Sequence, residues 1–310
     1  MTKRADLEAA LAGERLAARA ARARRFEAVE GGGAGNWLRR ALTAPGIYLP
    51  YVLSAKLGLA RLYASPVKLF WGRRVRIPLA DYDVLILSMY GGLYGSETPF
   101  TRFLIRTLGP GDVFYDIGAN LGFYTYLALE LAREVHAFEP VPSLAATIAA
   151  NARLGESLTV NAAALSDASG TATFYTGRST MVGTLDSAVA ERLREAGKSA
   201  GAITVPLLTL DEYVATHTPP TVLKIDAEGA EGRIIDGGRT LLSAHAPTIA
   251  MEVWGKGNQW ELSMHAVEKL RALGYRSYRL DEAGEPQPVA GDLSALLVPG
   301  GGENFLFKKS

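Results

Sequence analysis

Short apolar runs alternate with amphipathic helical stretches along most of the chain beyond residue 75. The apolar runs predict strands at 113–116, 134–139, 158–160, 222–226, 247–253, 275–280 and 304–307. Apolar residues at helical spacing predict helices at 100–108, 142–153 and 264–273. Strands that alternate with helices across short turns favour an α/β fold, a doubly wound, mostly parallel, Rossmann-like sheet of seven strands. The last two strands are expected to form an antiparallel pair at the sheet edge.

A glycine-rich break precedes this domain. We predict three parts: a helix at 1–30, a linker and helical cap at 31–74, and the α/β domain at 75–310. The first helix is rich in Ala, Arg and Glu and carries a basic cluster of Arg15, Arg19, Arg22, Arg24 and Arg25. Such a cluster is typical of a solvated helix or one that pairs with a partner, and contact with an anionic surface is the alternative.

The cap and one segment of the α/β domain each allow two interpretations. Residues 37–71 mix aromatic and apolar residues with Arg and Lys. They either pack as a helical cap, since irregularly spaced Trp, Tyr and Leu are usually core residues, or make peripheral contact with a membrane. Residues 177–202 form either a lid over the cofactor or a plain surface excursion.

The composition narrows the class of protein. With 310 residues the chain can bury a sizeable core, and without cysteine it cannot use disulfides, thiolate catalysis or cysteine-bound zinc. A net charge of +1 is not that of a generally basic nucleic-acid-binding protein. No apolar run reaches about 20 residues, the length of a membrane span, and the N-terminus lacks the apolar core of a secretory signal. These features predict a soluble, cytoplasmic enzyme without a nucleic-acid partner.

The stretch 113–125 carries the main functional signal. An apolar strand leads through Gly118 and Gly122 into a helix that runs to residue 131, which should leave free backbone N–H groups around a small pocket. Asp116 ends the strand, where open α/β sheets bind ligands, and its carboxylate would repel a pyrophosphate and attract a cation. Glu139, about 20 residues further on, is placed to bind ribose hydroxyls. S-adenosylmethionine (SAM), a cationic nucleoside without phosphate, is therefore the predicted cofactor.

The segment after the third strand is predicted to contact the adenine of this cofactor. It contains Asn161, Ala163 and Leu165, and its small and hydrogen-bonding residues suit a flat, uncharged base. Asn161 is alternatively a turn residue whose side chain binds its own backbone.

Four blocks resemble those of the FkbM-type SAM-dependent methyltransferases. They are Asp-Ile-Gly-Ala-Asn-Leu-Gly-Phe-Tyr-Thr from Asp116, Phe-Glu-Pro from Phe138, Asn-Ala-Ala-Ala-Leu-Ser-Asp from Asn161, and Leu-Lys-Ile-Asp-Ala-Glu-Gly-Ala-Glu from Leu223. The resemblance covers 97–254 and implies a class I methyltransferase fold that methylates a hydroxyl of a sugar, polysaccharide or other natural product, so the acceptor is a small molecule or a glycan. It also implies cofactor contacts from Glu97, Gly118, Ala119, Asn120, Gly122, Tyr124, Thr125 and Pro140. For Glu97, a role as the dipole partner of its helix is the alternative.

Acidic residues after the fourth strand are the predicted catalytic groups. An alcohol is a weak nucleophile, so a base or a metal ion must help to remove its proton. Asp226 and Glu228 lie at the carboxyl end of this strand, and we predict that one orients the cofactor while the other accepts the proton. Lys224 shares a strand face with Asp226 and is either its ion-pair partner or a catalytic residue. Asp226, Glu228 and Glu252 also suit Mg²⁺, which is kept as an alternative.

Three rival functions follow from the same residues. A nicotinamide-dependent oxidoreductase begins with a similar strand and turn, but this turn reads Gly-Ala-Asn-Leu-Gly and lacks the Gly-x-Gly-x-x-Gly spacing. Methyltransferases that act on nucleic-acid bases often carry Asp/Asn-Pro-Pro-aromatic where this chain has Asp-Ala-Glu-Gly. The third rival function is that of a protein that binds SAM without turnover. Each of these functions is compatible with a homo-oligomer.

Overall fold

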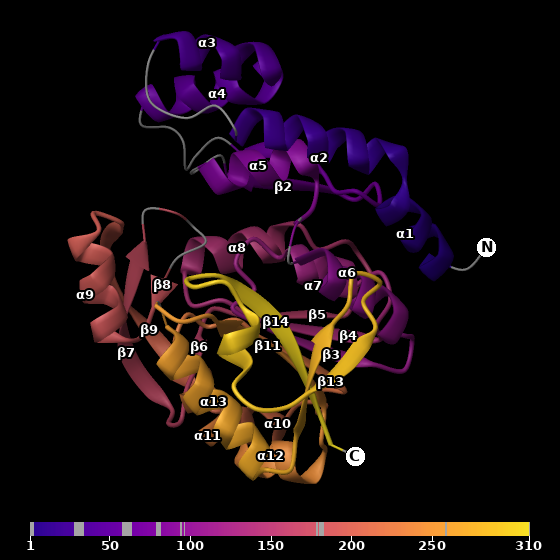
Figure 1. The fold of residues 1–310 in the computed structure, drawn as a ribbon, viewed down its shortest axis with the longest axis vertical. Coiled ribbons are helices and arrows are strands. Elements are labelled where there is room, and N and C mark those ends of the chain that lie inside the picture. The colour runs from indigo at the N-terminus through magenta and orange to yellow at the C-terminus, as the bar shows by residue number, and fades with distance from the viewer. Residues whose placement is uncertain are drawn as a thin grey trace. The chain divides into compact units, whose positions relative to one another are not determined.

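The computed structural model describes residues 3–27, 34–57, 64–78, 82–93, 95, 97–177, 179, 183–257 and 259–309. The chain forms two compact units (Figure 1). The N-terminal unit comprises residues 1–94 with 178–181, and the C-terminal unit comprises 95–177 with 182–310. The predicted glycine break at 31–33 lies outside the described residues. The three-part division of the chain stays a prediction.

The N-terminal unit combines helices with one β-hairpin. Its helices are α1 (Lys3–Ala12), α2 (Glu14–Glu27), α3 (Ala34–Thr43), α4 (Pro45–Lys56) and α5 (Tyr82–Tyr90), and β1 (Ala64–Lys68) pairs with β2 (Arg74–Pro78). Leu16, Ala20 and Ala23, spaced by four and three residues, turn one face of α2 into a small core shared with α5. This unit therefore extends past residue 74, because β2 pairs with β1 and α5 packs on α2.

Two arginines of the predicted basic cluster serve this unit internally. Arg19 donates to the carbonyl oxygens of Met89 at 3.1 Å and Lys68 at 2.8 Å, and Arg22 donates to that of Thr43 at 2.7 Å. The other three, Arg15, Arg24 and Arg25, are exposed. No helix among the described residues combines the length and apolarity that crossing a membrane requires.

The C-terminal unit is built on a sheet of eight strands. In spatial order these are β13 (Pro286–Val289), β12 (Arg276–Leu280), β14 (Gly302–Lys308), β11 (Thr248–Trp254), β10 (Val222–Ile225), β3 (Val113–Ile117), β4 (Glu134–Phe138) and β5 (Leu158–Asn161). The strands from β11 to β5 are parallel, and β14, β12 and β13 pair antiparallel with their neighbours. The predicted Rossmann-like, doubly wound sheet is confirmed, with β13 as an eighth strand beyond the seven predicted.

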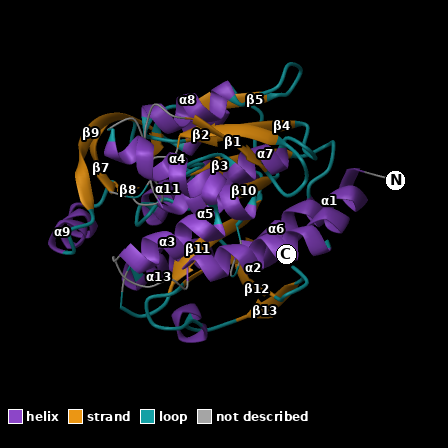
Figure 2. Ribbon diagram, turned by 90° about the horizontal axis from the view of Figure 1, so that it is seen from above, coloured by secondary structure: helices purple, strands orange, loops and turns teal. Residues whose placement is uncertain are grey.

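Helices cover both faces of this sheet (Figure 1). One face carries α6 (Glu97–Thr107), α7 (Phe123–Ala128) and α8 (Pro142–Ala150), and the other carries α10 (Leu210–Val214), α11 (Glu231–Asp236), α12 (Arg239–Ala244) and α13 (Trp260–Ala272). Figure 2 looks onto the sheet and shows its strands following one another from β5 to β13. A short 3₁₀ helix spans Leu293–Leu296. Helix α7 ends earlier than predicted, because the amides of Glu130 and Leu131 bond three residues back and tighten the chain.

The order of the strands reverses between β3 and β10. From β3 the chain moves outward through β4 and β5, then crosses to β10 on the other side of β3. Open α/β sheets bind ligands at the carboxyl ends of the strands at such a switch point. Of the acidic residues singled out in the sequence, Asp116 and Glu252 lie near the ends of β3 and β11, and Asp226 and Glu228 follow β10.

A second sheet of four strands lies in the same unit. Its order is β6 (Ala164–Leu165), β9 (Ser199–Leu208), β7 (Gly170–Gly177) and β8 (Gly183–Thr184), and α9 (Ser187–Glu195) follows β8. Asp186 caps α9 by accepting hydrogen bonds from the amides of Ala188 and Val189. The lid function considered for 177–202 stays a prediction, and residues 178 and 180–182 lie outside the described part.

Candidate active site at the switch point

Left-handed backbone shapes the turn between β3 and α7. Gly118, Asn120 and Gly122 have φ angles of 75°, 51° and 81°, which glycine adopts freely and asparagine tolerates. A Cβ on Gly118 would lie 1.8 Å from the backbone oxygen of Asp226, and one on Gly122 would lie 2.9 Å from the Tyr126 ring. These glycines therefore let the turn pack against the end of β10 and against its own helix.

The backbone N–H groups of this turn are used by the protein itself. Those of Gly118 and Ala119 donate to the Phe138 carbonyl at 3.0 and 3.1 Å, and that of Asn120 donates to the Glu139 carboxylate at 2.8 Å. The prediction of free N–H groups is therefore wrong for these three residues. A phosphate needs such donors, so this turn is poorly suited to a pyrophosphate.

Asp116 is a buried acid with one unsatisfied oxygen. Its side chain is 1% exposed, and its Oδ2 accepts a hydrogen bond of 2.6 Å from the Thr125 hydroxyl. No donor among the described residues reaches its Oδ1. Burial raises the pKa of Asp116, against the lowering effect of Lys224, which is its partner in the strand register. Asp116 thus presents a buried acceptor that a cationic donor would satisfy.

Lys224 forms a buried ion pair with Asp226. Its Nζ lies 2.9 Å from Oδ2 of Asp226, and its side chain is 3% exposed. Burial by itself lowers the pKa of Lys224, but Asp226 and Asp116 outweigh it and raise the pKa above its ordinary value. The ammonium also lies 5.4 Å from the centre of the Tyr124 ring. The predicted pairing of Lys224 with Asp226 is confirmed, and Lys224 remains charged.

Glu97 connects α6, α7 and β14. Its carboxylate accepts a hydrogen bond of 2.5 Å from the Tyr124 hydroxyl and one of 3.2 Å from the Asn304 amide. Burial raises the pKa of Glu97, and Asp226 adds to that effect. Glu97 therefore belongs to the same electrostatic cluster as Asp226, as well as standing in the first turn of α6.

Glu228 stands in a strained conformation after β10. Its φ of 48° lies in the left-handed region, which is uncommon for a residue other than glycine. The Gln259 amide donates to its Oε2 at 2.8 Å, and the Thr184 hydroxyl donates to its backbone oxygen at 2.7 Å. Burial, with Asp226 nearby, raises the pKa of Glu228 to about 8. Glu231 holds this turn by accepting from the Gly229 amide at 3.1 Å.

Glu252 completes a group of buried carboxyls. It lies near the end of β11, next to Met251, the register partner of Ile225, and is itself paired in register with Asn304 of β14. Burial raises the pKa of Glu252 well above its usual range, and Asp226 and Glu228 add to the effect. The cluster, called the acid cluster below, comprises Glu97, Asp116, Asp226, Glu228 and Glu252. Lys224 is the one cation that acts on these carboxyls among the described residues.

The geometry does not support the Mg²⁺ alternative. No group of three or more His, Cys, Asp or Glu side chains in the described part of the chain is arranged to hold a metal ion. The acids instead engage protein donors, such as Tyr124, Gln259 and Lys224.

Glu139 lies where the sequence placed it, after β4. It is 4% exposed, and its two oxygens accept hydrogen bonds of 2.8 Å from the amides of Asn120 and Val141. Burial raises the pKa of Glu139 to about 7, although these two hydrogen bonds act to lower it. Each oxygen keeps a second lone pair for a further donor. Pro140 follows directly and is buried.

The predicted adenine residues are partly committed to the protein. The Asn161 amide donates to the Tyr213 hydroxyl at 3.0 Å, and that hydroxyl contacts Nδ1 of His136 at 2.7 Å. Leu165 belongs to the main apolar core, and Ala163 is buried. The amide nitrogen of Asn161 is therefore used by the protein and is not left for a ligand. The side chain does not bind its own backbone turn either.

Three residues beside the acids were missed in the sequence: Asn304, Gln259 and Thr184. Asn304 lies 207 residues from its partner Glu97, and Gln259 and Thr184 lie 31 and 44 residues from their partner Glu228, beyond any local motif. Asn304 alone left a signal, since it is a polar residue at an inward position of an otherwise apolar strand. No donor in the described residues reaches Oδ1 of Asn304 or Oε1 of Gln259. With Asp116, the site thus offers three buried acceptors and calls for a ligand that carries donors.

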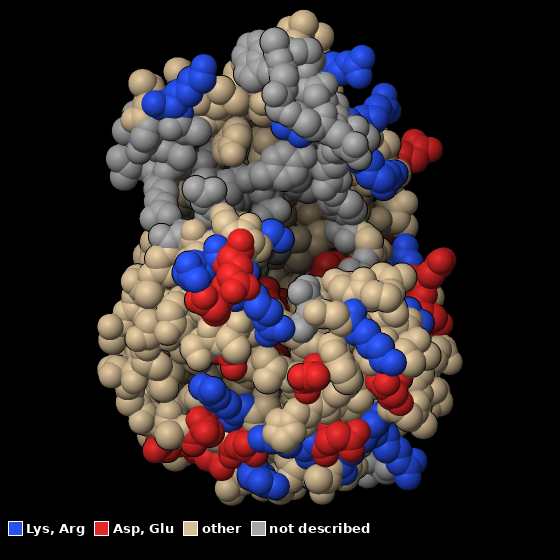
Figure 3. All heavy atoms as spheres, turned by 60° about the vertical axis from the view of Figure 1, so that its left-hand side comes forward, with Lys and Arg blue, Asp and Glu red and all other residues tan. Residues whose placement is uncertain are grey.

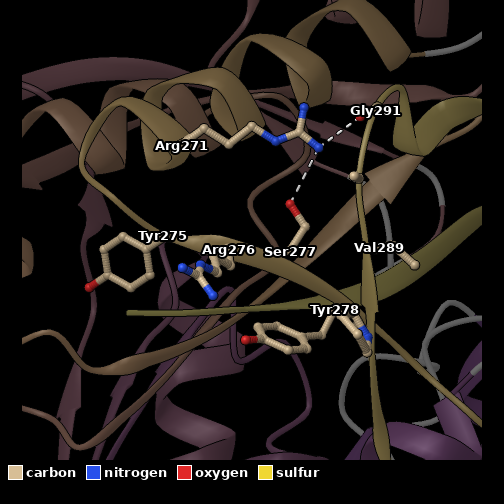
Figure 4. A pocket seen from close by; sticks show the side chains of 9 residues that line it. Arg271, Tyr275, Arg276, Ser277, Tyr278, Val289 and Gly291 are labelled. Carbon is tan, nitrogen blue, oxygen red and sulfur yellow. Dashed lines mark hydrogen bonds between the residues drawn. The ribbon is translucent and has the colours of Figure 1, made fainter. Parts of the chain in front are cut away.

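A separate hollow of about 560 Å³ lies between β12 and β13 (Figure 4). Arg271 at its rim donates to the Gly291 carbonyl at 2.7 Å and to the Ser277 hydroxyl at 3.4 Å. The hollow includes Arg276, the first residue of β12, and β12 runs parallel to β11. It therefore lies towards the amino ends of the parallel strands and away from the acid cluster.

Comparison with known proteins identifies the family. Residues 116–277 match the methyltransferase FkbM domain. The 31-O-demethyl-FK506 methyltransferase FkbM of Streptomyces tacrolimicus is 34% identical over 157 residues, which are 42% of this chain and 60% of that relative.

Two solved structures are also similar. The methyltransferase FkbM of Methylobacillus flagellatus KT has a TM-score of 0.39 and 13% identity, covering 92% of this chain and 58% of the other. The precorrin-6y C5,15-methyltransferase of Geobacter metallireducens GS-15 has a TM-score of 0.38 and 14% identity, covering 69% of this chain and 87% of the other.

The FkbM domain match spans more than half of the chain and contains the carboxyl ends of both strands at the switch point, β3 and β10. The chain belongs to the FkbM methyltransferase family.

Proposed function

We propose that the protein is a SAM-dependent O-methyltransferase that methylates a hydroxyl of a sugar, polysaccharide or other natural product. The observation that carries the proposal is the acid cluster, four carboxyls near the carboxyl ends of β3, β10 and β11 together with Glu97 of α6, with Lys224 as the nearby cation. Such a site has an excess of negative charge, and burial raises the pKa of four of the five acids. A cationic ligand is what this arrangement favours.

SAM fits the donor and acceptor groups of the site. It carries an ammonium, a sulfonium and ribose hydroxyls, and it supplies an electrophilic methyl group when bound. Asp116 and Asn304 offer buried oxygens without donors, and Glu139 keeps free lone pairs. Asp116 would hold the ammonium and Glu139 the ribose, with Ala163 and Leu165 on the adenine side. A dinucleotide fits less well, because the turn's N–H groups are already used.

The geometry supports different roles for the two predicted catalytic acids. Asp226 is paired with Lys224 at 2.9 Å and is assigned the orienting and charge-balancing role. Glu228 has no cationic partner within salt-bridge distance among the described residues, and Gln259 fixes its carboxylate. We assign Glu228 as the general base that takes the acceptor's hydroxyl proton, while the acceptor oxygen bonds to the methyl carbon and the carbon–sulfur bond breaks. A pKa of about 8 suits a base that works near neutral pH.

A hydroxyl acceptor has support from the relative. The name of the Streptomyces tacrolimicus protein gives an O-demethyl compound as its methyl acceptor. The aligned segment covers 60% of that protein, so the acceptor of the present chain is inferred as a class, a hydroxyl, and not as that compound. A glycan or small-molecule acceptor, a cytoplasmic location and the absence of a nucleic-acid partner stay predictions.

Calorimetric titration of SAM into three variants tests the cofactor assignment. Asp116→Ala should abolish binding, because it removes the buried acceptor, and Asp226→Ala should reduce turnover more than binding. Asp236→Ala is the matched control, an ion-paired aspartate of α11, and should bind SAM like the wild type. Unchanged affinity in Asp116→Ala would refute the assignment.

Transfer of a labelled methyl group tests the reaction. The protein is incubated with tritium-labelled SAM and candidate glycans or glycosides, and mass spectrometry looks for the gain of one methyl group on oxygen. SAM binding without transfer to any hydroxyl would favour a binding protein without turnover. An absorbance change from a nicotinamide cofactor would favour the oxidoreductase.

A further inference from the structure

Exposed leucines are concentrated on two helices of the N-terminal unit. Among the described residues, eight large apolar side chains are exposed, and five of them lie on or directly after α3 and α4: Leu38, Leu42, Leu49, Leu53 and Leu57. Leu42 is 74% exposed and Leu53 is 61% exposed. Soluble proteins scatter such residues singly, so a group of five within 20 residues marks an interaction surface.

The spacing of these leucines places them in stripes. Leu38 and Leu42 are four residues apart on α3, and Leu49, Leu53 and Leu57 are spaced by four along α4 and its end. Residues four apart lie on the same side of a helix. Other residues of the same segment pack in the core of the unit: Ala41 of α3, Tyr48 of α4 and Ala44 between the two helices. The leucines are therefore not needed for that core. We call these five residues the leucine surface.

The charge around the leucine surface is strongly positive. Residues 34–57 contain Arg39, Arg40 and Lys56 and no acidic residue. Residues 1–94 contain 15 Lys and Arg against 7 Asp and Glu, a net charge of +8, so residues 95–310 carry −7. The near-neutral total hides this asymmetry. On the face drawn in Figure 3, Lys and Arg outnumber Asp and Glu over the described part of the N-terminal unit, whereas both signs are mixed over the other unit.

We propose that the leucine surface docks the protein on an anionic lipid membrane. Apolar side chains beside arginine and lysine suit a lipid interface, where leucine enters the acyl boundary and the cations meet anionic headgroups. No described helix could cross the bilayer, so the contact would lie in the plane of the interface. A nucleic acid would use the cations and leave the leucines without a partner. A second copy would bring two positive surfaces together. The inference does not depend on the proposed methyl transfer.

Co-sedimentation of the full chain with lipid vesicles tests this. We expect binding to vesicles of phosphatidylcholine with phosphatidylglycerol and at least tenfold weaker binding to pure phosphatidylcholine. Leu42→Ser with Leu53→Ser should weaken binding to the anionic vesicles by roughly a hundredfold, from the loss of two apolar side chains. The matched control is Leu154→Ser with Val298→Ser, two exposed apolar residues of the C-terminal unit, and should bind like the wild type.

A charge variant gives a second, independent measurement. The double variant Arg39→Glu with Lys56→Glu reverses two exposed charges and should weaken binding to the anionic vesicles at least tenfold. Added salt should likewise weaken the binding of the wild type to these vesicles. Three results would overturn the proposal: no binding to either vesicle, equal binding by the leucine variant, or tighter binding to single-stranded RNA than to the anionic vesicles. Self-association that the leucine variant abolishes, without vesicle binding, would assign the surface to a second copy instead.

Discussion

Replacement of Lys224 by methionine tests the charge balance at the switch point. Lys224 is 3% exposed, pairs with Asp226 at 2.9 Å and lies beside Asp116 in the strand register. Removing one partner of a buried ion pair costs about 3–5 kcal/mol of unfolding free energy, because the remaining carboxylates lose their counter-charge. The Asp226 side chain is 36% exposed, so solvent screens part of the loss and we expect about 3 kcal/mol.

The expected loss appears as a lower melting temperature. In a domain of about 150–250 residues, 1 kcal/mol shifts Tm by roughly 2–4 °C, so Lys224→Met should melt about 6–12 °C below the wild type at pH 7.5. Lys224 lowers the pKa of both Asp116 and Glu97, so its removal raises both further. When the pKa of an acid is higher in the folded than in the unfolded state, the protein loses stability as the pH rises from the unfolded pKa to the folded pKa. The Tm deficit should therefore shrink from pH 7.5 towards pH 5.

Lys269→Met is the matched control for differential scanning calorimetry. Lys269 pairs with Asp236, and the two side chains are 22% and 32% exposed. A pair that solvent screens contributes at most about 1 kcal/mol, so this variant should melt close to the wild type. Equal Tm deficits in the two variants, or a Lys224→Met deficit that does not change between pH 5 and 7.5, would refute the charge-balance argument.

Three further predictions concern single positions of the site. Gly118→Ala should lower Tm and abolish SAM binding, because its Cβ would overlap the Asp226 oxygen, while Gly111→Ala, with nothing within 4 Å, should match the wild type in both. Below about pH 8 the methyl-transfer rate should rise with pH as Glu228 ionises, and Glu228→Gln should be slow at every pH. Glu139→Gln should raise the Kd of SAM roughly 10- to 100-fold, because an acceptor is lost, and wild-type affinity should fall below pH 7 as Glu139 gains its proton.

The sequence by itself determined the order of the elements and the positions of the acids. Period-two and apolar patterns are local, so the strands that begin at 113 and 134 were readable, with their ends displaced by one residue. The acids Asp116 and Glu139 follow from the strand ends, and the pairing of Lys224 with Asp226 follows from the alternation of side chains along one strand. Such inferences need only neighbours in the chain.

Only the tertiary structure decided which of these groups meet. The register between β10 and β3 places Lys224 beside Asp116, more than 100 residues away, and β14 brings Asn304 to Glu97. The same packing uses the turn's N–H groups internally and turns the Asn161 amide to the core. Long-range pairing depends on sheet order and burial, which no local pattern encodes. A charge cluster built from four separate segments, α6, β3, β10 with its following turn, and β11, therefore becomes visible only when the chain is folded.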